Sequence, residues 1–337
     1  MRPGAAVTYP TEPQGKVPTV AIVGCGSIGT AFAVLFARAG FAVRAWDAVP
    51  GAFERARTDL DARLGLLDSF GLLLEPASVI SARVSFHPEL RDAVLGAELV
   101  QECAPEDIEL KRSLFTRLSE HSGEDTVLAS SSSALVPSSF AADLGAKSRV
   151  IVGHPGNPPY LLPVIEVVPA SFTDPAAVER AAALYRRAGL KVIHVRFEVE
   201  GFVFNRLQGA LLREAYCLVR DGVVSVEDVD EVVRSGLGRR WSVLGPFETV
   251  DLNTRGGIAS HALKMGPAYE RMGAERGQYD PWTPELVEEV ARQRRAVLPL
   301  DDWEDRVRWR DEQLMRLEGF FLERLFVDSD DFLAAAD

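Results

Sequence analysis

The chain has 337 residues and a formal net charge of −12, with 37 lysines and arginines against 49 aspartates and glutamates. This acidic balance, without a block of basic residues, argues against nucleic acid or an anionic membrane as a partner. The composition, 47% hydrophobic and 26% charged, is that of an ordinary globular protein, and the length suits two domains. Cys25, Cys103 and Cys217 show no CxxC spacing, which favours a reducing, cytoplasmic setting over disulfides or a zinc site.

The N-terminal part of the chain has the order of one nucleotide-binding unit. Residues 1–17 contain proline and glycine throughout and no apolar run, which predicts a flexible tail and neither a signal peptide nor a membrane span. A β-branched run at 19–24 predicts a buried strand, and a helix is expected over 27–40. A second strand over 41–46 completes the strand–turn–helix–strand order.

Two domains are expected from the change of pattern along the chain. Further strands are predicted at 98–101, 126–130, 149–153, 164–168 and 190–195, most of them separated by helices. This alternation predicts a Rossmann-type α/β domain with a mostly parallel sheet over residues 18–199. Apolar residues at steps of three and four over 201–222, and a capping box at Ser225 and Asp228, then predict an all-helical domain over residues 200–337.

Gly24, Gly26 and Gly29 form a G-x-G-x-x-G pattern between the first strand and the first helix. The first glycine permits the tight turn, the second lets a pyrophosphate approach the backbone, and the third lets the helix pack close to the strand. Ser27 and Ile28 stand at the helix N-terminus, whose N–H groups and dipole attract an anion. The pattern therefore predicts a dinucleotide site.

Asp47 follows the second strand, where a carboxylate can accept both ribose hydroxyls and repel a 2′-phosphate. This position favours NAD over NADP. The alternative is a glycine-rich turn that only packs, which the complete strand–turn–helix–strand context makes the weaker interpretation. Cys25 is interpreted as a small residue of the turn.

Seven motifs together resemble the 3-hydroxyacyl-CoA dehydrogenase superfamily, from about residue 18 to about residue 318. They are GCGSIG, QECAPEDIELK, SSSSALVPS, GHPGNPPY, GFVFNRLQ, GLGRRWSVLGPFET and WRDEQLMRL. The last two are similar to the lambda-crystallin branch, whose enzyme activity is L-gulonate 3-dehydrogenase. The resemblance implies an NAD-dependent dehydrogenase with a helical domain for substrate binding and homodimer formation.

For the proline-rich stretch at 153–169, the resemblance implies that His154 is the catalytic acid/base and Glu166 its partner. The chemistry can also be argued directly, because an imidazole with an ordinary pKa of about 6.5 can take a hydroxyl proton near neutral pH. A carboxylate on the other ring nitrogen fixes the tautomer and stabilises the imidazolium. Glu166 in an apolar strand is costly unless it is paired, so we expect the two residues to meet across neighbouring strands.

The resemblance also implies roles for Ser133, which would hold the reacting oxygen of the substrate, and for Asn205, which would contact the same atom. The alternative for Asn205 is an ordinary amide at a helix end. Ser130–Ser132 are expected to belong to a polar loop that caps the following helix near Val136.

Three further residues are assigned to the cofactor by the same resemblance. Asn157 should lie near the nicotinamide, and Glu106 and Lys111 should contact the ribose side. The alternative for Glu106 and Lys111 is an exposed charge pair on a helix. No metal site is expected, because the remaining histidines show no metal-ligand spacing: His87, His121, His194 and His261.

The charges of the chain favour a small free acid as the substrate. A CoA tail carries three phosphate groups, yet the helical hairpin expected over 50–85 contains no lysine and four arginines against five acidic residues. A free acid needs a cation for its carboxylate, and Arg240, before Trp241, matches the arginine of the lambda-crystallin branch. The alternative is that Arg239 and Arg240 form a solvated pair on a helix end.

The sequence therefore predicts NAD-dependent oxidation of the C3 hydroxyl of a small 3-hydroxy acid similar to L-gulonate, with His154 as the general base. Alternatives are a 3-hydroxyacyl-CoA dehydrogenase or a carnitine dehydrogenase. Carnitine also carries a cation, for which Tyr160 and Trp241 alone are weak evidence of an aromatic cage. A non-catalytic, crystallin-like protein is a further alternative. Gly156 replaces a larger apolar residue of the relatives, which suggests a wider substrate pocket.

Overall fold

The computed structural model describes residues 17–242, 245–253 and 257–277, and separate residues and short runs between 285 and 319. The described residues form two compact units. The first holds the residues up to Asn205 and those from Trp309 onward, and the second holds those between Arg206 and Arg308. Met315, for example, is buried in the core of the first unit.

An eight-stranded sheet organises the first unit, in the order β3-β2-β1-β4-β5-β6-β7-β8. The strands are β1 (Thr19–Val23), β2 (Ala42–Trp46), β3 (Val84–Phe86), β4 (Leu99–Glu102), β5 (Val127–Ser130), β6 (Val150–Pro155), β7 (Val164–Pro169) and β8 (Lys191–His194). Neighbouring strands are parallel except β6 and β7, which are antiparallel. The prediction of a mostly parallel Rossmann-type sheet is confirmed.

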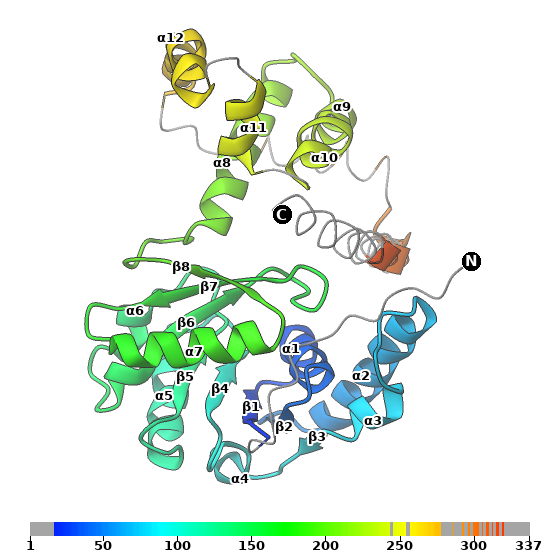
Figure 1. The fold of residues 1–337 in the computed structure, drawn as a ribbon, viewed down its shortest axis with the longest axis vertical. Coiled ribbons are helices and arrows are strands. Elements are labelled where there is room, and N and C mark those ends of the chain that lie inside the picture. The colour runs from blue at the N-terminus through cyan, green and yellow to red at the C-terminus, as the bar shows by residue number, and fades with distance from the viewer. Residues whose placement is uncertain are drawn as a thin grey trace, which may run out of the picture. The chain divides into compact units, whose positions relative to one another are not determined.

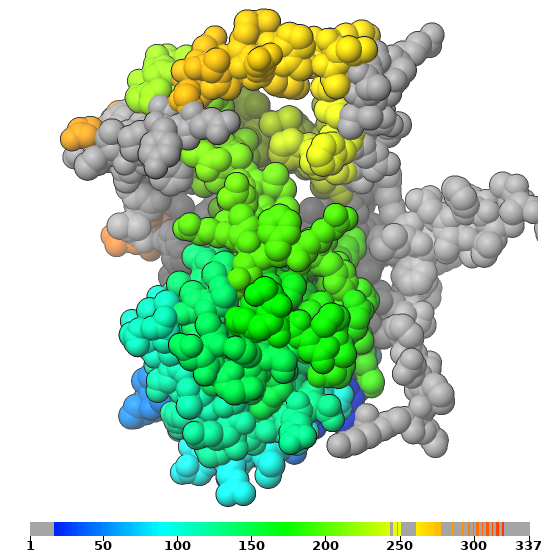
Figure 2. Space-filling model, turned by 90° about the vertical axis from the view of Figure 1, so that its left-hand side faces the viewer, coloured from blue at the N-terminus to red at the C-terminus, as the bar shows by residue number. Residues whose placement is uncertain are grey.

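Helices cover both faces of this sheet, as the ribbon shows (Figure 1). One face packs against α1 (Ser27–Arg38), α2 (Ala52–Ser69) and α7 (Pro175–Arg187), and the other against α4 (Leu90–Val94), α5 (Ile108–His121) and α6 (Pro137–Ala141). Side chains alternate between the two cores, since Val20 and Ile22 belong to the first and Ala21 and Val23 to the second. Burial on both faces explains the continuous apolar run of β1. Figure 2 shows one side of this closely packed unit, formed by segments coloured cyan to green.

The segment after β2 differs in part from its predicted form. Two helices are present, α2 and α3 (Ala77–Ser81), but the stretch then enters the sheet as β3. This strand is only three residues long and pairs on one side, with β2. Its sequence, VSF, is too short to show a strand period.

The second unit is helical in the part of the chain that is described. Its elements are α8 (Phe204–Arg220, starting in the first unit), α9 (Val226–Glu231), the π-helix η2 (Val232–Leu237), α10 (Gly238–Trp241), α11 (Pro246–Asn253), α12 (Gly257–Arg276) and η3 (Leu300–Asp302). Ser225 caps α9 by accepting from the N–H of Asp228, as the capping box predicts. Among the described helices, none combines the length and the apolar character that a membrane crossing requires.

Candidate active site

The strand order reverses between β1 and β4, and at this point the carboxyl ends of the strands open a crevice where ligands of such sheets bind. The glycine-rich turn lies at this edge. Gly24 has a φ of +101°, and a Cβ there would meet the backbone of Cys103 at 2.8 Å. A Cβ on Gly29 would lie 1.8 Å from the carbonyl oxygen of Gly24. At Gly26, by contrast, a Cβ would meet nothing within 4 Å, so the turn leaves open space there.

The start of α1 is suited to an anion. Its N-cap is Gly26, which has no side-chain hydrogen bond to the helix, and no acidic residue lies in the first turn. The N–H groups of this turn and the positive end of the helix dipole therefore face the open space at Gly26 without a carboxylate of their own helix. The turn fits the pyrophosphate of a dinucleotide.

Asp47 is fixed at the end of β2 by two backbone N–H groups. Its Oδ2 accepts from Cys25 at 2.6 Å and its Oδ1 from Val49 at 2.7 Å. Each carboxylate oxygen keeps capacity for a further donor, such as a ribose hydroxyl. Asp47 therefore serves the turn as well as the predicted ribose site.

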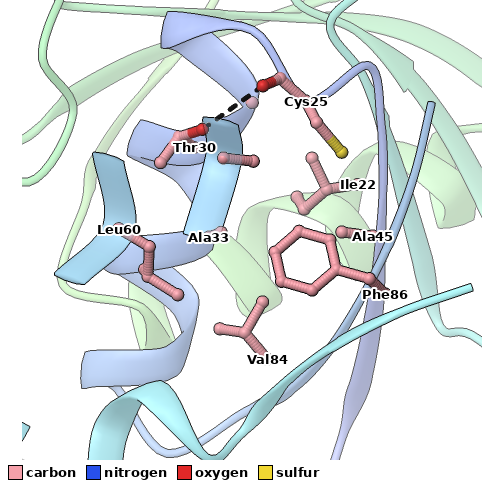
Figure 3. A pocket seen from close by; sticks show the side chains of 10 residues that line it. Ile22, Cys25, Thr30, Ala33, Ala45, Leu60, Val84 and Phe86 are labelled. Carbon is pink, nitrogen blue, oxygen red and sulfur yellow. Dashed lines mark hydrogen bonds between the residues drawn. The ribbon is translucent and has the colours of Figure 1, made fainter. Parts of the chain in front are cut away.

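An apolar pocket lies beneath the turn, lined by side chains of β1, β2, β3, α1 and α2 (Figure 3). Cys25 lies at its edge, and its carbonyl oxygen accepts from the Thr30 hydroxyl at 3.4 Å. Burial and the nearby carboxylate of Asp47 raise the pKa of the Cys25 thiol to about 12. Cys25 is thus a packing residue in protonated form at neutral pH, in agreement with the sequence interpretation.

His154 and Glu166 meet directly opposite each other on β6 and β7. Nδ1 of His154 lies 2.8 Å from Oε2 of Glu166, and both side chains are buried. The expectation that the two residues meet across neighbouring strands is confirmed. Because a carboxylate oxygen only accepts, Nδ1 carries the proton and Nε2 is left to accept one.

The other oxygen of Glu166 binds the backbone at the start of α8. Oε1 accepts from the N–H of Val203 at 2.7 Å and of Phe204 at 3.0 Å. A helix N-terminus interacts favourably with a carboxylate, so these contacts hold the Glu166 side chain in place beside His154. No local pattern indicates this contact, because it joins residues 37 and 38 positions apart.

Two aromatic rings pack beside the imidazole. The ring centroids of Phe202 and Phe204 lie 5.5 and 6.1 Å from that of His154. Phe202 is fully buried and has a φ of +50°, an unusual value for a residue other than glycine, and it follows Gly201 with a φ of +74°. Strained backbone of this kind clusters at functional sites. The bend directs the chain from β8 into α8 past the His154 side chain.

Ser133 and Asn205 are brought together, though not through the serine hydroxyl. Nδ2 of Asn205 donates to the carbonyl oxygen of Ser133 at 2.8 Å. Ser133 is exposed, in the turn between β5 and α6. The same turn is held by Ser132, whose hydroxyl accepts from the N–H of Leu135 at 2.7 Å. Ser132 therefore stabilises the turn before α6 rather than capping the helix itself, where Val136 is the N-cap.

Glu106 fastens this serine turn to the loop after β4. Its Oε1 accepts from the Ser132 hydroxyl and from the N–H groups of Ala134 at 3.1 Å and Leu135 at 3.2 Å. Burial acts to raise the pKa of Glu106, but these hydrogen bonds, with the charge of Lys111, bring it below its usual range. Glu106 is partly exposed, so it remains a candidate for the ribose contact.

Lys111 and Glu106 do pair, with Nζ 3.8 Å from Oε2, but Lys111 is buried and is not the exposed residue that the alternative expects. The ribose contact of Lys111 stays a prediction. The Lys111 side chain is 1% exposed, and Nζ lies 2.9 Å from both oxygens of Glu102, which the sequence analysis did not single out. Glu102 also accepts from Ser130 and from the N–H of Ala104, each at 2.6 Å. Burial raises the pKa of Glu102 and the Lys111 ammonium offsets part of that shift. The pair is structural: it ties α5 to the ends of β4 and β5.

Gly156 does not widen the site in the way that the sequence suggested. A Cβ there would come within 3.0 Å of Leu162 and Val164, so neighbouring side chains already fill the space. Asn157 follows as an exposed residue at the end of β6. Arg240 is exposed on α10 in the second unit. No group of side chains suited to a metal ion occurs among the described residues.

The family model of the 3-hydroxyacyl-CoA dehydrogenase NAD-binding domain matches residues 19–198, and that of the C-terminal domain matches residues 201–297. The chain belongs to the 3-hydroxyacyl-CoA dehydrogenase family. The NAD cofactor predicted from the turn is thereby confirmed, and the chain is an NAD-dependent hydroxy-acid dehydrogenase of this family.

Relatives in this family differ in what they are named for. A lambda-crystallin homolog of Bos taurus is 40% identical over 307 residues, 88% of this chain and 94% of the relative. An L-carnitine dehydrogenase of Streptomyces griseus is 40% identical over 293 residues, 84% of each chain. The solved structure of 5-formyl-3-hydroxy-2-methylpyridine 4-carboxylic acid 5-dehydrogenase, an NAD⁺-dependent dismutase, has a TM-score of 0.75 at 31% identity, covering 91% of this chain and 99% of its own. The family is clear, and the relatives leave the substrate open.

Asp47 provides a test of cofactor choice. We expect the wild-type protein to use NAD far better than NADP, and Asp47→Ala to reduce this preference by weakening NAD. Because Asp47 also binds the N–H groups of Cys25 and Val49, the variant should lose some NAD affinity through a looser turn. Steady-state kinetics with both cofactors measures the effect. Equal turnover of NAD and NADP by the wild type would contradict the assignment.

Proposed function

We propose that the protein oxidises the C3 hydroxyl of a small free 3-hydroxy acid similar to L-gulonate, with His154 as the general base. The observation that carries this proposal is the buried pair of His154 and Glu166, which leaves one imidazole nitrogen able to accept a proton. A panel of free 3-hydroxy acids, with carnitine and 3-hydroxybutyryl-CoA, tests it by NAD-dependent turnover.

His154 would take the proton of the substrate hydroxyl on Nε2 as the C3–H bond breaks. NAD, when bound, supplies the acceptor for the hydride. Glu166 would stabilise the imidazolium that forms, and its contacts with the start of α8 hold it in position. Ser133 and Asn205 would orient the reacting oxygen, and Asn157 would lie beside the nicotinamide. The hydrogen bond between Asn205 and Ser133 supports their proposed role in orienting the reacting oxygen.

The charges of α2 and α3 support a free acid over a CoA thioester. Arg83, which follows α3, is paired with Glu75 at 2.6 Å, and this pairing reduces its attraction for the phosphate groups of CoA. The segment also contains no lysine, so it offers few cations to a CoA tail.

Arg240 is proposed to bind the substrate carboxylate. Arg240→Met should raise KM for the acid by about tenfold or more, because a charge-assisted hydrogen bond contributes about 1.5–3 kcal/mol. The affinity for NAD should change little. Initial rates over a range of acid concentrations measure the effect, with Arg239→Met as the matched control, expected to be nearly silent.

Two outcomes would change this proposal. A wild-type enzyme that prefers 3-hydroxybutyryl-CoA over every free acid would overturn the substrate class. An exchange of effects between the Arg239 and Arg240 variants would correct the residue and leave the substrate class intact.

The relatives also suggest other functions for this protein. The identity to L-carnitine dehydrogenase makes carnitine the second substrate to test. A non-catalytic role, as in a lens crystallin, is disfavoured by the intact set of Ser133, His154, Glu166 and Asn205. We also propose a homodimer through the helical unit, where large apolar side chains such as Phe247 and Leu263 are 78% and 81% exposed among the described residues.

A further inference from the structure

Arg63 of α2 reaches the start of α1 and the loop that follows His154. Its guanidinium binds Asp59 through two contacts of 2.8 Å and donates to the Ser27 hydroxyl at 3.0 Å. It also lies 6.0 Å from the centre of the Tyr160 ring and forms a hydrogen bond with that side chain. Arg63 therefore joins the glycine-rich turn, α2 and the proline-rich loop of the first unit.

Arg63 brings a positive charge to the start of α1. The N-terminal end of the helix dipole is also positive, so both groups attract an anion to this point. The first turn of α1, where acidic residues are usually enriched, contains none. Asp59 compensates part of the charge of Arg63 from the other side, but Ser27 offers only a neutral hydroxyl. Two positive groups thus converge where Gly26 leaves open space.

We propose that Arg63 is a pyrophosphate-binding residue of the NAD site. The Ser27 hydroxyl is a neutral partner that the guanidinium can exchange for a phosphate oxygen, which forms a stronger, charge-assisted hydrogen bond. The pyrophosphate of NAD brings two negative charges to the point where the helix dipole and Arg63 meet. Because Arg63 also binds Tyr160, the same contact steadies the loop between His154 and β7 when the cofactor arrives.

The experiment measures dissociation constants of the full chain for NAD, ADP-ribose and adenosine, with adenosine as a competitor of NAD. Arg63→Met should weaken NAD and ADP-ribose, which both carry the pyrophosphate, by about tenfold or more. Adenosine carries no phosphate and should bind as in the wild type. The salt dependence of NAD binding should also become weaker.

Arg57→Met is the matched control, because Arg57 is an exposed arginine of the same helix that lies over the Phe86 ring at 5.3 Å. It removes the same charge and should leave all three affinities unchanged. Arg63→Lys, which keeps the charge without the fork of N–H groups, should recover part of the affinity for NAD and ADP-ribose. Arg63→Lys also tests the proposal if Arg63→Met does not fold. Unchanged NAD affinity in Arg63→Met, or an equal loss for adenosine and NAD, would overturn the assignment.

Discussion

Replacement of His154 by alanine is expected to lower kcat by about 10²- to 10⁴-fold and to leave the affinity for NAD nearly intact. The imidazole lies on β6, buried against Glu166. In the proposed mechanism it would act on the hydroxyl proton rather than on the dinucleotide. The loss should therefore appear in the chemical step. Stopped-flow measurement of NADH formation in a single turnover separates that step from product release.

His194→Ala is the matched control for this variant. His194 is an exposed histidine on β8, whose strand neighbours β7, and it contacts Arg186 at 2.8 Å. Loss of the His194 side chain should leave kcat within a factor of about two, since surface substitutions away from a site usually have small effects. A His154→Ala enzyme with wild-type kcat would remove His154 from the mechanism.

Glu166→Gln is expected to reduce kcat by about 10²-fold, although the two side chains have the same shape. In the wild type both oxygens accept: one from His154, the other from the N–H groups of Val203 and Phe204. Glutamine has one oxygen and one NH₂ group, so it can satisfy only one side. If the oxygen faces the helix, the NH₂ faces His154 and forces the proton onto Nε2, where it blocks the base. If the oxygen faces His154, the NH₂ group of the glutamine faces the N–H groups at the start of α8, and no acceptor lies between these donors.

The pH–rate profile distinguishes this effect from simple loss of structure. Without the carboxylate the imidazolium loses its charged partner, so the profile of Glu166→Gln should differ from that of the wild type. Glu200 is an exposed glutamate between β8 and α8, and Glu200→Gln should leave both kcat and the pH–rate profile unchanged. Full activity of Glu166→Gln would show that the carboxylate is not needed to set the tautomer.

The sequence predicted those parts of the site that depend on local pattern. The glycine-rich turn could be predicted because a Cβ on Gly24 or Gly29 would collide with the backbone, so these two positions allow few other residues. The meeting of His154 and Glu166 could be predicted because a charge in an apolar strand needs a partner, and two strands joined by a short stiff loop are neighbours. In both cases a wrong residue would cost much folding free energy, and the interacting groups lie close together in the sequence or on adjacent strands.

Other features depend on partners in neighbouring elements that no local pattern reveals. Lys111 has the spacing of an exposed helical residue, yet it is buried because Glu102 ends the neighbouring strand. Gly156 suggests a wider pocket until Leu162 and Val164 are seen to fill the space. The short strand β3 forms because β2 offers an open edge, and its own residues show no strand pattern.

The contacts of Glu166 affect where the domains of different family members could be joined in a chimaeric protein. The two family models meet between residues 198 and 201, which makes that point an obvious junction for chimaeras. A junction there would take Phe202, Val203 and Phe204 from a different parent than Glu166 and His154, although these five residues form one contact group. A junction after Asn205 keeps the group and the Asn205–Ser133 contact within one parent. A chimaera that keeps the His154–Glu166 pair therefore needs the first residues of α8 from the same parent.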